Sequence, residues 1–286
     1  MLEETTAELS VVIPTFNEEI NLKQCLDSIA SWVDEIVVVD SGSTDGTLEI
    51  ARRYTDRIVS HEYENAPKQW EWILANASLS NEWVLGLDAD YRVTPELRTA
   101  IQSALRSPSS STDGYYVRHK QIFRGQFIKH GGIYPRYRLC LFRKDRVFVD
   151  ETDLVDNRFY VHGRTEKLEF DIIEDNQKEV SFQTWVRKQI TYAERAAEEE
   201  LNRSNGPFSQ RGSWRKGRNE RVLWLKTRWL RLPLYWRSVG YFLYRYIFRL
   251  GFLDGRAGFL YHFSQALLFR IMLDARLEEL KSSPKK

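Results

Sequence analysis

Three stretches of the chain decide its fold: SVVIPTFNEE (residues 10–19), EIVVVDSGSTDGT (residues 35–47) and EWVLGLDADYRVTPEL (residues 82–97). Each contains a short run of β-branched or other apolar residues, which is typical of a strand buried on both faces. Each run ends in a cluster of polar and acidic residues. Because helical patterns separate the runs, the order predicts right-handed βαβ units on a parallel sheet.

The remaining patterns extend this α/β order along the chain. We expect strands over 9–13, 35–39, 57–60 and 83–87, and helices over 18–30, 46–54, 67–77 and from Pro95 onward. Later strands are expected over 115–123, 138–142 and 159–161, and a charged helix over 181–201. The segment SPSSSTD (residues 107–113) is expected to be a loop and the seam between two halves. The sequence thus predicts a catalytic domain over residues 1–206 and a helical region over residues 207–286.

The composition is that of an ordinary globular protein. Of 286 residues, 42% are hydrophobic and 29% are charged, and the net charge of +2 favours no particular partner. Cys25 and Cys140 lie far apart and lack metal-ligand spacing, which favours a reducing compartment. The polar N-terminus, MLEETTAELS, does not resemble a secretory signal, so a cytoplasmic location is expected.

Polar clusters follow three of the expected strands: Pro14–Glu18, Asp40–Asp45 and Asp88–Asp90. Open parallel sheets bind ligands beyond the carboxyl ends of their strands, so these clusters are expected to line one crevice. Each also has a structural interpretation. Asp40 could close an Asx-turn, and Asn17 or Glu18 could cap the helix that follows.

The Asp-x-Asp pair of Asp88 and Asp90 is the most specific of these clusters. Two carboxylates at the end of a buried strand repel one another unless a cation or a proton intervenes. Oxygen ligands at such a place suit Mg²⁺ or Mn²⁺ shared with a diphosphate, whose charge must be neutralised. The alternative is a pair of surface turn acids.

Taken together, the three stretches resemble the nucleotide-binding half of the family 2, GT-A-type inverting glycosyltransferases, from about Leu9 to Leu201. The resemblance implies a GT-A-like open sheet and a nucleotide-sugar donor, with UDP as the expected nucleotide. It also implies a divalent metal, Mg²⁺ or Mn²⁺, as cofactor. The nucleotide-binding residues that it implies are Pro14, Thr15, Asn17, Glu18, Asp40, Ser41, Gly42, Lys68 and Asp88.

Within that set the resemblance gives individual roles. Asp40 would accept the N–H of the uracil imide, Asp88 would face the ribose or diphosphate, and Asp90 would ligate the metal. Lys68 stands where the family often has a basic residue.

Two later segments resemble bacterial transferases that extend lipopolysaccharide cores and related lipid-linked glycans. GGIYPRYRLCLF (residues 131–142) is similar to their acceptor-side segment, and RLGFLDGRAGF (residues 249–259) to their C-terminal motif. A lipid-linked or membrane-anchored glycan acceptor is therefore expected. The acceptor-side or phosphate-side candidates are His130, Tyr134, Arg136 and Arg138.

The catalytic base departs from the family's pattern. Related enzymes carry it in a Val-His-Glu-type segment, and the best match is Val155-Asp156-Asn157, with Asn157 at the expected Glu position. An inverting displacement needs a carboxylate to take the proton of the acceptor hydroxyl. Asp156 is the candidate, with Asp150, Glu151 and Asp153 close by, and turn acids on a loop are the structural alternative. Glu174 and Asp175 are further candidates.

The C-terminal region has the pattern of a membrane-surface element. No apolar run of about 18 residues exists. At helical spacing one arc holds Trp236, Val239, Phe242, Leu243, Tyr246, Ile247 and Leu250, and Arg237, Arg245 and Arg249 lie off it. This predicts an amphipathic helix in an anionic lipid interface, with Trp236, Phe242, Tyr246 and Ile247 as lipid contacts.

The stretch before this helix is strongly basic. Residues 211–231 hold eight Lys or Arg and one acid, Glu220, which would add to attraction by anionic lipid. The alternative is a helix packed on the catalytic domain with its Arg residues in salt bridges. A nucleic-acid partner is not expected, because no RNA-binding motif accompanies the basic tract.

These patterns predict an inverting transferase, peripheral on the inner face of the membrane, that moves a sugar from a UDP sugar to a hydroxyl of a lipid-linked acceptor. Two other classes stay open. A non-catalytic scaffold of the same fold is favoured by Asn157 standing where a base is expected. A nucleotidyltransferase could share the sheet and the metal site, but its Gly-rich start is missing from Leu9–Glu19.

Overall fold

A computed structural model describes residues 6–106, 111–150, 158–205, 228–229 and 232–282. These residues form two compact units. Unit 1 comprises the chain up to Lys129 and residues 133–181, and unit 2 comprises residues 130–132 and the chain from Phe182 onward. Because the placement of one unit against the other is not determined, each unit is described by itself.

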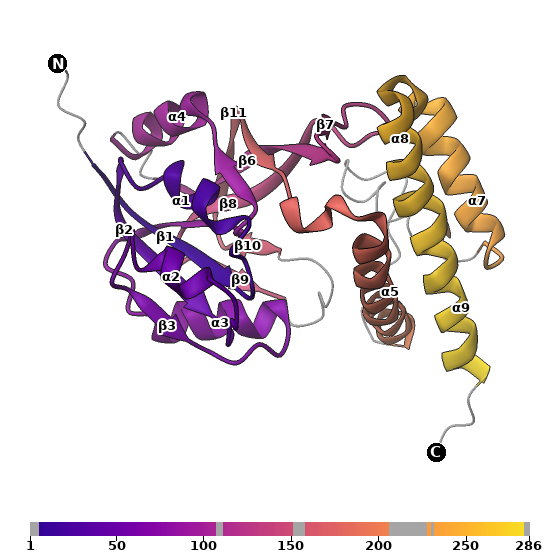
Figure 1. Cartoon of the computed structure of the whole chain (residues 1–286), viewed down its shortest axis with the longest axis horizontal. Coiled ribbons are helices and arrows are strands. Elements are labelled where there is room, and N and C mark those ends of the chain that lie inside the picture. The colour runs from indigo at the N-terminus through magenta and orange to yellow at the C-terminus, as the bar shows by residue number, and fades with distance from the viewer. Residues whose placement is uncertain (1–5, 107–110, 151–157, 206–227, 230–231, 283–286) are drawn as a thin grey trace. The chain divides into compact units, whose positions relative to one another are not determined.

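Unit 1 is built on a nine-stranded sheet with the strand order β3-β2-β1-β4-β8-β6-β11-β5, and β7 pairs with β6 (Figure 1). Strands β1 to β4 are parallel, as the alternation of strands and helices predicted, whereas β8 is antiparallel to both of its neighbours. The strands of this sheet are β1 (Ala7–Thr15), β2 (Val33–Asp40), β3 (Ile58–Ser60), β4 (Trp83–Gly86), β5 (Tyr91–Val93), β6 (Thr112–Phe123), β7 (Gln126–Phe127), β8 (Arg136–Arg143) and β11 (Arg164–Glu174). A separate hairpin pairs β9 (Val147–Val149) with β10 (Phe159–Val161).

Helices cover both faces of the sheet, which explains why the residues of β1 are apolar on both sides. Val11 and Ile13 belong to one buried cluster with residues of α1 (Leu22–Asp27), α2 (Thr47–Ala51) and α4 (Pro95–Arg106). Val12 faces a second cluster with Trp70 of α3 (Ala66–Asn76). The expected α/β class with a large central sheet is confirmed.

The sheet continues across the segment that was expected to separate two halves. Thr112 and Asp113 lie in β6, and β6 joins β8, which pairs directly with β4. The expectation of a seam over residues 107–113 was therefore wrong for the part of the segment that is described. Strands β8 and β6 extend the same hydrogen-bonded sheet, and β8 covers the edge of β4.

Unit 2 is helical. Its elements are α5 (Phe182–Asn205), α7 (Trp236–Leu243), a π-helical turn η2 (Tyr244–Phe248), a 3₁₀ turn η3 (Gly251–Asp254), α8 (Gly255–His262), a second π-helical turn η4 (Phe263–Leu268) and α9 (Phe269–Ser282). Ala193 and Ala197 of α5 pack against Leu273 and Leu277 of α9. The structure thus groups α5 with the C-terminal helices, whereas the sequence placed the boundary after residue 206.

Arg237 occupies a position that the sequence pattern did not foresee. Its side chain is buried, donates from Nε to Asp274 Oδ1 over 2.7 Å and donates from Nη1 to Glu200 Oε1 over 2.8 Å. Arg237 was expected on a lipid-facing basic flank, and that expectation was wrong. A buried guanidinium needs charged partners, and α5 and α9 supply them.

The candidate membrane helix is also shorter than expected. α7 ends at Leu243, and the π-helical turn η2 rotates the side chains that follow. Among the described helices none is both long enough and apolar enough to cross a bilayer. Most of the basic stretch over residues 211–231 lies outside the described residues.

Candidate functional site

The three polar clusters lie at one edge of the sheet in unit 1. Thr15 pairs with Asp40 at the ends of β1 and β2, and Val12 pairs with Gly86 near the end of β4. Since all three strands run in the same direction, their carboxyl ends and the loops that follow meet there. The sequence predicted this juxtaposition on the condition that the three strands lie side by side, and β1 does pair with both β2 and β4.

Asp40 organises the loop between β2 and α2. Its buried carboxylate accepts hydrogen bonds from the Thr15 hydroxyl (3.0 Å), the Gly42 N–H (3.0 Å), the Ser43 N–H (2.8 Å) and the Ser43 hydroxyl (2.5 Å). These four donors match the roughly four lone-pair positions of a carboxylate. The loop can close in this way because Gly42 has a φ of 85°, which glycine adopts without strain. The Asx-turn interpretation of Asp40 therefore describes the local geometry.

The loop after β1 is tied to the loop after β2. Asn17 has a φ of 53°, its N–H donates to the Ser43 hydroxyl over 2.8 Å, and its side-chain oxygen accepts from the Thr44 N–H over 2.8 Å. The N–H of Glu18 donates to the Thr47 hydroxyl over 2.6 Å. Residues 15–18 and 40–47 thus form one hydrogen-bonded surface.

A third loop, which follows β11, closes this surface. Lys178 forms an ion pair with Glu18, and its ammonium donates to the carbonyl oxygen of Asn17 over 3.1 Å. Asn21 accepts from the Gln177 N–H over 2.8 Å and donates to the Asn176 side chain over 3.1 Å. A cation therefore stands beside the first polar cluster, where sequence reasoning placed none.

Asp88 and Asp90 follow β4 and are both half-buried, while Ala89 between them is buried. The carbonyl oxygen of Asp88 accepts from the Tyr91 N–H over 3.0 Å, and that of Asp90 accepts from the Asp175 N–H over 3.0 Å. Burial, and then the charges of Asp90, Asp88 and Glu18, raise the pKa of the Cys25 thiol. Three carboxylates thus contribute to the raised pKa of this buried thiol.

Opposite this acidic pair lies a second group of charges around Glu174. The side chain of Arg136 lies with Nη2 3.6 Å from Glu174 Oε2, and Nδ1 of His119 lies 3.7 Å from the same oxygen. Arg138 donates from Nη1 to the hydroxyl of Tyr91 over 3.4 Å. Burial works to raise the pKa of Glu174, but contact with His119 and the charges of Arg138 and Arg136 outweigh it and lower that pKa to about 2.

The acceptor-side candidates are divided between the two units. Arg136 and Arg138 face the Glu174 group, whereas the hydroxyl of Tyr134 donates to Asp171 Oδ1 over 2.9 Å. His130 belongs to unit 2, where Asp254 accepts from its N–H over 2.8 Å and lies 2.6 Å from its Nδ1.

The two segments that resemble lipopolysaccharide-core transferases contact each other in unit 2. The N–H of Gly131 donates to the carbonyl oxygen of Arg249 over 2.8 Å, and Arg245 donates from Nε to the carbonyl oxygen of Gly131 over 2.9 Å. A Cβ at Gly131 would lie only 2.0 Å from the ring of His262. Any larger side chain at position 131 would clash with His262, so this position requires glycine.

Lys68 and its neighbour take different positions near the second cluster. Lys68 is exposed and pairs with Glu64 one helical turn away. Gln69, by contrast, is buried, binds Nδ1 of His61 over 2.7 Å and lies 3.4 Å from the hydroxyl of Ser41. It is Gln69 that links α3 to the Asp40 loop.

The predicted base lies outside the described residues, as do Glu151, Asp153 and Asn157. Asp150 is described and is exposed. The two further base candidates are already engaged: Glu174 as above, and Asp175 in an ion pair with Arg92 over 2.8 Å.

The donor set fits a hard divalent cation only if a ligand completes it. Among the described residues no cluster of three or more His, Cys, Asp or Glu side chains could hold a metal ion alone. Mg²⁺ is commonly bound by one or two carboxylates together with water and substrate phosphate oxygens. Asp88 and Asp90 provide the carboxylate part of such a set.

Comparison with known proteins identifies the family of this chain. A model of glycosyl transferase family 2 matches residues 10–155, about half of the chain. The chain belongs to glycosyl transferase family 2.

Named relatives match a shorter part of this family 2 chain. An uncharacterized glycosyltransferase of Rickettsia conorii is 32% identical over 102 residues, which are 36% of this chain and 36% of the relative. The lipopolysaccharide core biosynthesis glycosyltransferase LpsC of Rhizobium meliloti is 30% identical over 143 residues, or 48% of this chain and 52% of that protein. The matches thus span about a third to a half of these relatives' length.

Two solved structures are similar over more of the chain at low identity. TarS of S. aureus in complex with UDP is 16% identical, with a TM-score of 0.44 and coverage of 96% of this chain and 91% of that chain. Glucosyl-3-phosphoglycerate synthase of Mycobacterium tuberculosis is 19% identical, with a TM-score of 0.45 and coverage of 71% and 82%.

The residues near this end of the sheet that sequence reasoning missed or left in reserve are Lys178, Gln69 and Glu174. Lys178 and Gln69 carry no local signal, because each contacts a loop that is distant in sequence. Glu174 is the last residue of β11, whose sequence RTEKLEFDIIE contains so many charged residues that no strand was predicted there. Only the apolar residues of that strand, from Leu168 to Ile173, could have indicated that it was a strand.

We predict that Glu174→Gln destabilises the family 2 protein in a pH-dependent way. The folded pKa of Glu174 lies below the ordinary value of about 4.3, so its stabilising effect is complete above that value and is lost as pH falls toward 2. At pH 7 the substitution should lower the free energy of unfolding by roughly 1–3 kcal/mol. Urea denaturation at pH 7 and pH 3 measures this.

The control for this prediction is Glu49→Gln, on the exposed face of α2. It should change the unfolding free energy by less than about 0.5 kcal/mol at both pH values. An equal deficit of Glu174→Gln at pH 3 and pH 7 would contradict the assignment.

Proposed function

We propose that this protein is an inverting glycosyltransferase that moves a sugar from a UDP sugar to a hydroxyl of a lipid-linked or membrane-anchored glycan. The observation that carries the proposal is the gathering of the Asp40 loop, the Asn17–Glu18 loop and the Asp88–Asp90 pair at one edge of the sheet. Family 2 membership supports the reaction class. TarS of S. aureus was solved in complex with UDP, and that ligand is an observation on TarS and not on this chain.

Donor binding is assigned to the hydrogen-bonded surface formed by residues 14–18 and 40–42. Because all four lone-pair positions of Asp40 are engaged, the uracil N–H would have to displace one loop donor or bind beside it. Ser41, next to Asp40, is the residue that Gln69 approaches. Pro14 and Thr15 are the last two residues of β1 and lead directly into the loop that forms part of this surface.

Asp90, with Asp88 beside it, would hold Mg²⁺ or Mn²⁺, and the cation would stabilise the departing diphosphate. This chain's own cations lie nearby in unit 1: Arg138 of β8 acts on the hydroxyl of Tyr91, and Arg136 faces Glu174. These guanidiniums are suited to phosphate oxygens, to which their planar N–H groups can donate. Glu174 holds Arg136 in place by charge.

Asp156 is proposed as the base that takes the proton of the acceptor hydroxyl. Inversion follows from a single in-line attack that needs no nucleophile of the enzyme. Asp150 and Glu151 precede it and provide alternatives within six residues.

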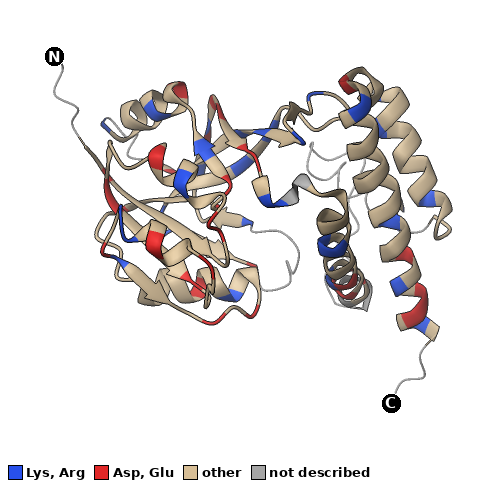
Figure 2. Cartoon of the chain, in the orientation of Figure 1, with Lys and Arg blue, Asp and Glu red and all other residues tan. Residues whose placement is uncertain are grey.

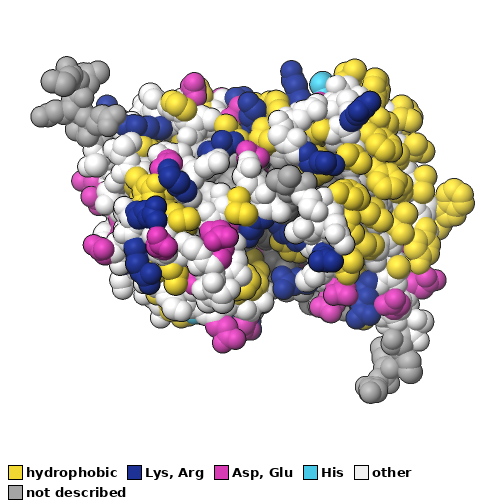
Figure 3. Space-filling model, viewed as in Figure 1, with side chains coloured by type: hydrophobic (Ala, Val, Ile, Leu, Met, Phe, Trp, Pro, Cys, Tyr) yellow, Lys and Arg dark blue, Asp and Glu magenta, His cyan; other side chains and the backbone are white. Residues whose placement is uncertain are grey.

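The acceptor class is proposed from two observations of different kinds. LpsC, which is similar over half of its length, is named for lipopolysaccharide core biosynthesis. Unit 2 exposes large apolar side chains, among them Trp236, Ile247 and Phe248, which are 76%, 49% and 75% exposed. Figure 3 shows hydrophobic side chains gathered over α7 and α8, and Figure 2 shows few charges along these helices. Exposed patches of this kind mark interaction sites, and a peripheral position on the inner face of the membrane suits them.

The lipid contacts differ from the arc read from the sequence. Trp236 and Ile247 are exposed, as a lipid contact requires. Phe242 and Tyr246 are half-buried and stack on one another at 5.3 Å, so they support the surface from beneath.

Asp90→Ala should reduce sugar transfer by at least 10²-fold, because a diphosphate without a compensating charge leaves poorly. EDTA should inhibit the wild type, and Mn²⁺ should restore it. Release of UDP in the presence of acceptor is the measurement. Asp56→Ala, an exposed acid of the same unit, is the control and should keep full activity. Full wild-type activity in EDTA would remove the metal from the mechanism.

Asp156→Asn should lower kcat by a factor of about 10²–10⁴, as is typical when proton transfer is lost, and should leave UDP affinity unchanged. Asp150→Asn and Glu151→Gln are made alongside it and should keep turnover within about threefold. Stopped assays of sugar transfer and calorimetry with UDP give the two readings. If Asp156→Asn stays active and one neighbour does not, the base assignment moves to that neighbour.

Wild-type protein should float with anionic vesicles and partly dissociate in 1 M salt, where the Debye length is about 3 Å. Trp236→Glu and Ile247→Glu should each weaken flotation, because they put a charge into the apolar surface. Ile190→Glu, a matched exposed isoleucine of α5, should not. Equal loss from Ile190→Glu and Ile247→Glu, or no flotation of the wild type, would rule out this surface.

A further inference from the structure

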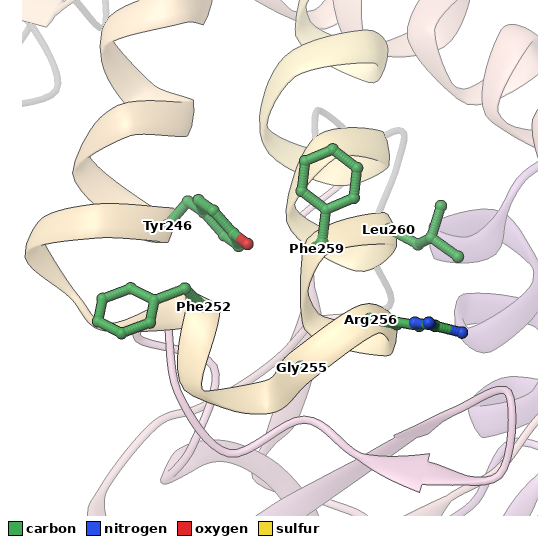
Figure 4. A pocket seen from close by; sticks show the side chains of 6 residues that line it. All are labelled: Tyr246, Phe252, Gly255, Arg256, Phe259 and Leu260. Carbon is green, nitrogen blue, oxygen red and sulfur yellow. The ribbon is translucent and has the colours of Figure 1, made fainter.

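Unit 2 contains an open pocket of about 560 Å³ beside the turn that joins η3 to α8. Figure 4 shows the side chains that line it: Tyr246 of η2 and Phe252 of η3 on one side, and Arg256, Phe259 and Leu260 of α8 on the other. The sixth residue is Gly255, whose φ of 60° makes the turn between them. All of these residues belong to one unit, so the pocket does not depend on how the units are placed.

The walls of the pocket are aromatic and remain open to solvent. The ring of Tyr246 lies 6.3 Å from that of Phe252 and 5.7 Å from that of Phe259, both in edge-to-face geometry. Phe252 and Phe259 are nonetheless 45% and 43% exposed. Tyr246 thus contacts both phenylalanine rings edge to face, and part of the surface of those rings stays exposed to water. A hydrocarbon chain could cover this exposed apolar area.

The charge of the pocket comes from Arg256, which is exposed. Among the described residues no carboxylate forms an ion pair with it, and residues 236–273 contain one acid, Asp254. Asp254 is buried and holds His130 through its N–H and Nδ1. The charge of Arg256 is thus left for an external anion, and a guanidinium binds phosphate oxygens with two parallel donors.

We propose that this pocket binds one anionic phospholipid of the membrane, with a hydrocarbon chain against Tyr246, Phe252 and Phe259 and the phosphate on Arg256. Apolar walls alone would suit any hydrophobic partner, but an unpaired guanidinium among the lining residues selects an amphiphile with an anionic head. The inference rests on the proposed membrane attachment for its physiological setting. It adds a single stoichiometric lipid site to a surface that otherwise acts only by its general apolar and basic character.

The test uses the full-length protein and monomeric dihexanoylphosphatidylglycerol, kept below its critical micelle concentration, in isothermal titration calorimetry. Saturable binding of one lipid per chain is expected. Arg256→Gln should weaken it at least about tenfold, which corresponds to one lost charge-assisted hydrogen bond. Phe259→Ala should weaken it by a similar factor, with the fold checked by circular dichroism.

Arg249→Gln is the matched control. Arg249 is an exposed arginine of the same unit that does not line the pocket, and its substitution should change the affinity by less than about twofold. Equal losses from Arg249→Gln and Arg256→Gln would overturn the proposal, because they would indicate general surface charge. Absence of saturation would overturn it as well.

Inorganic phosphate separates a lipid from a free anion. Phosphate at the same concentration should neither bind measurably nor displace the lipid; displacement would show an anion site and overturn the proposal. Monomeric lipid needs no bilayer and no catalysis. Loss of vesicle flotation with retained lipid binding would therefore count against membrane attachment alone, and the reverse result against the pocket alone.

Discussion

The buried carboxylate of Asp40 joins the ends of β1 and β2 and fixes the loop on which the whole site depends. A charge removed from water is tolerated only when hydrogen bonds replace its hydration. Thr15, Gly42 and Ser43 supply four such bonds, and Ser43 in turn accepts the N–H of Asn17. The first two polar clusters are therefore one structure. Substitutions that disturb this carboxylate should alter both clusters together.

The sequence predicted the strands β1, β2 and β4 and the polar loops that follow them, because each is a continuous stretch with its own pattern of apolar and polar residues. β1, β2 and β4 are short runs buried on both faces, and such runs carry their own signal. The polar residues after them then follow from the parallel order of the strands. β11 was not predicted, because it is a partly exposed strand with charged residues at alternate positions.

Side chains that act across long sequence distances were also beyond prediction. Lys178 reaches Glu18 from 160 residues away, and Arg237 is buried only because Glu200 and Asp274 lie on neighbouring helices. Periodicity placed Arg237 off the apolar arc correctly, but it could not distinguish an arginine in water from one in a buried ion pair. Arg256 stays exposed and no described carboxylate pairs with it, so its charge is left to act on an external anion.

If the loops after β1, β2 and β4 form one donor-nucleotide site, a bound nucleotide should protect all three loops from hydrogen–deuterium exchange. Exchange is compared with and without UDP and Mn²⁺. Peptides that cover residues 14–18, 40–45 and 88–90 should gain protection together, and peptides of β9 and β10 should not change. Protection of one of these loops alone, or of none, would contradict the account.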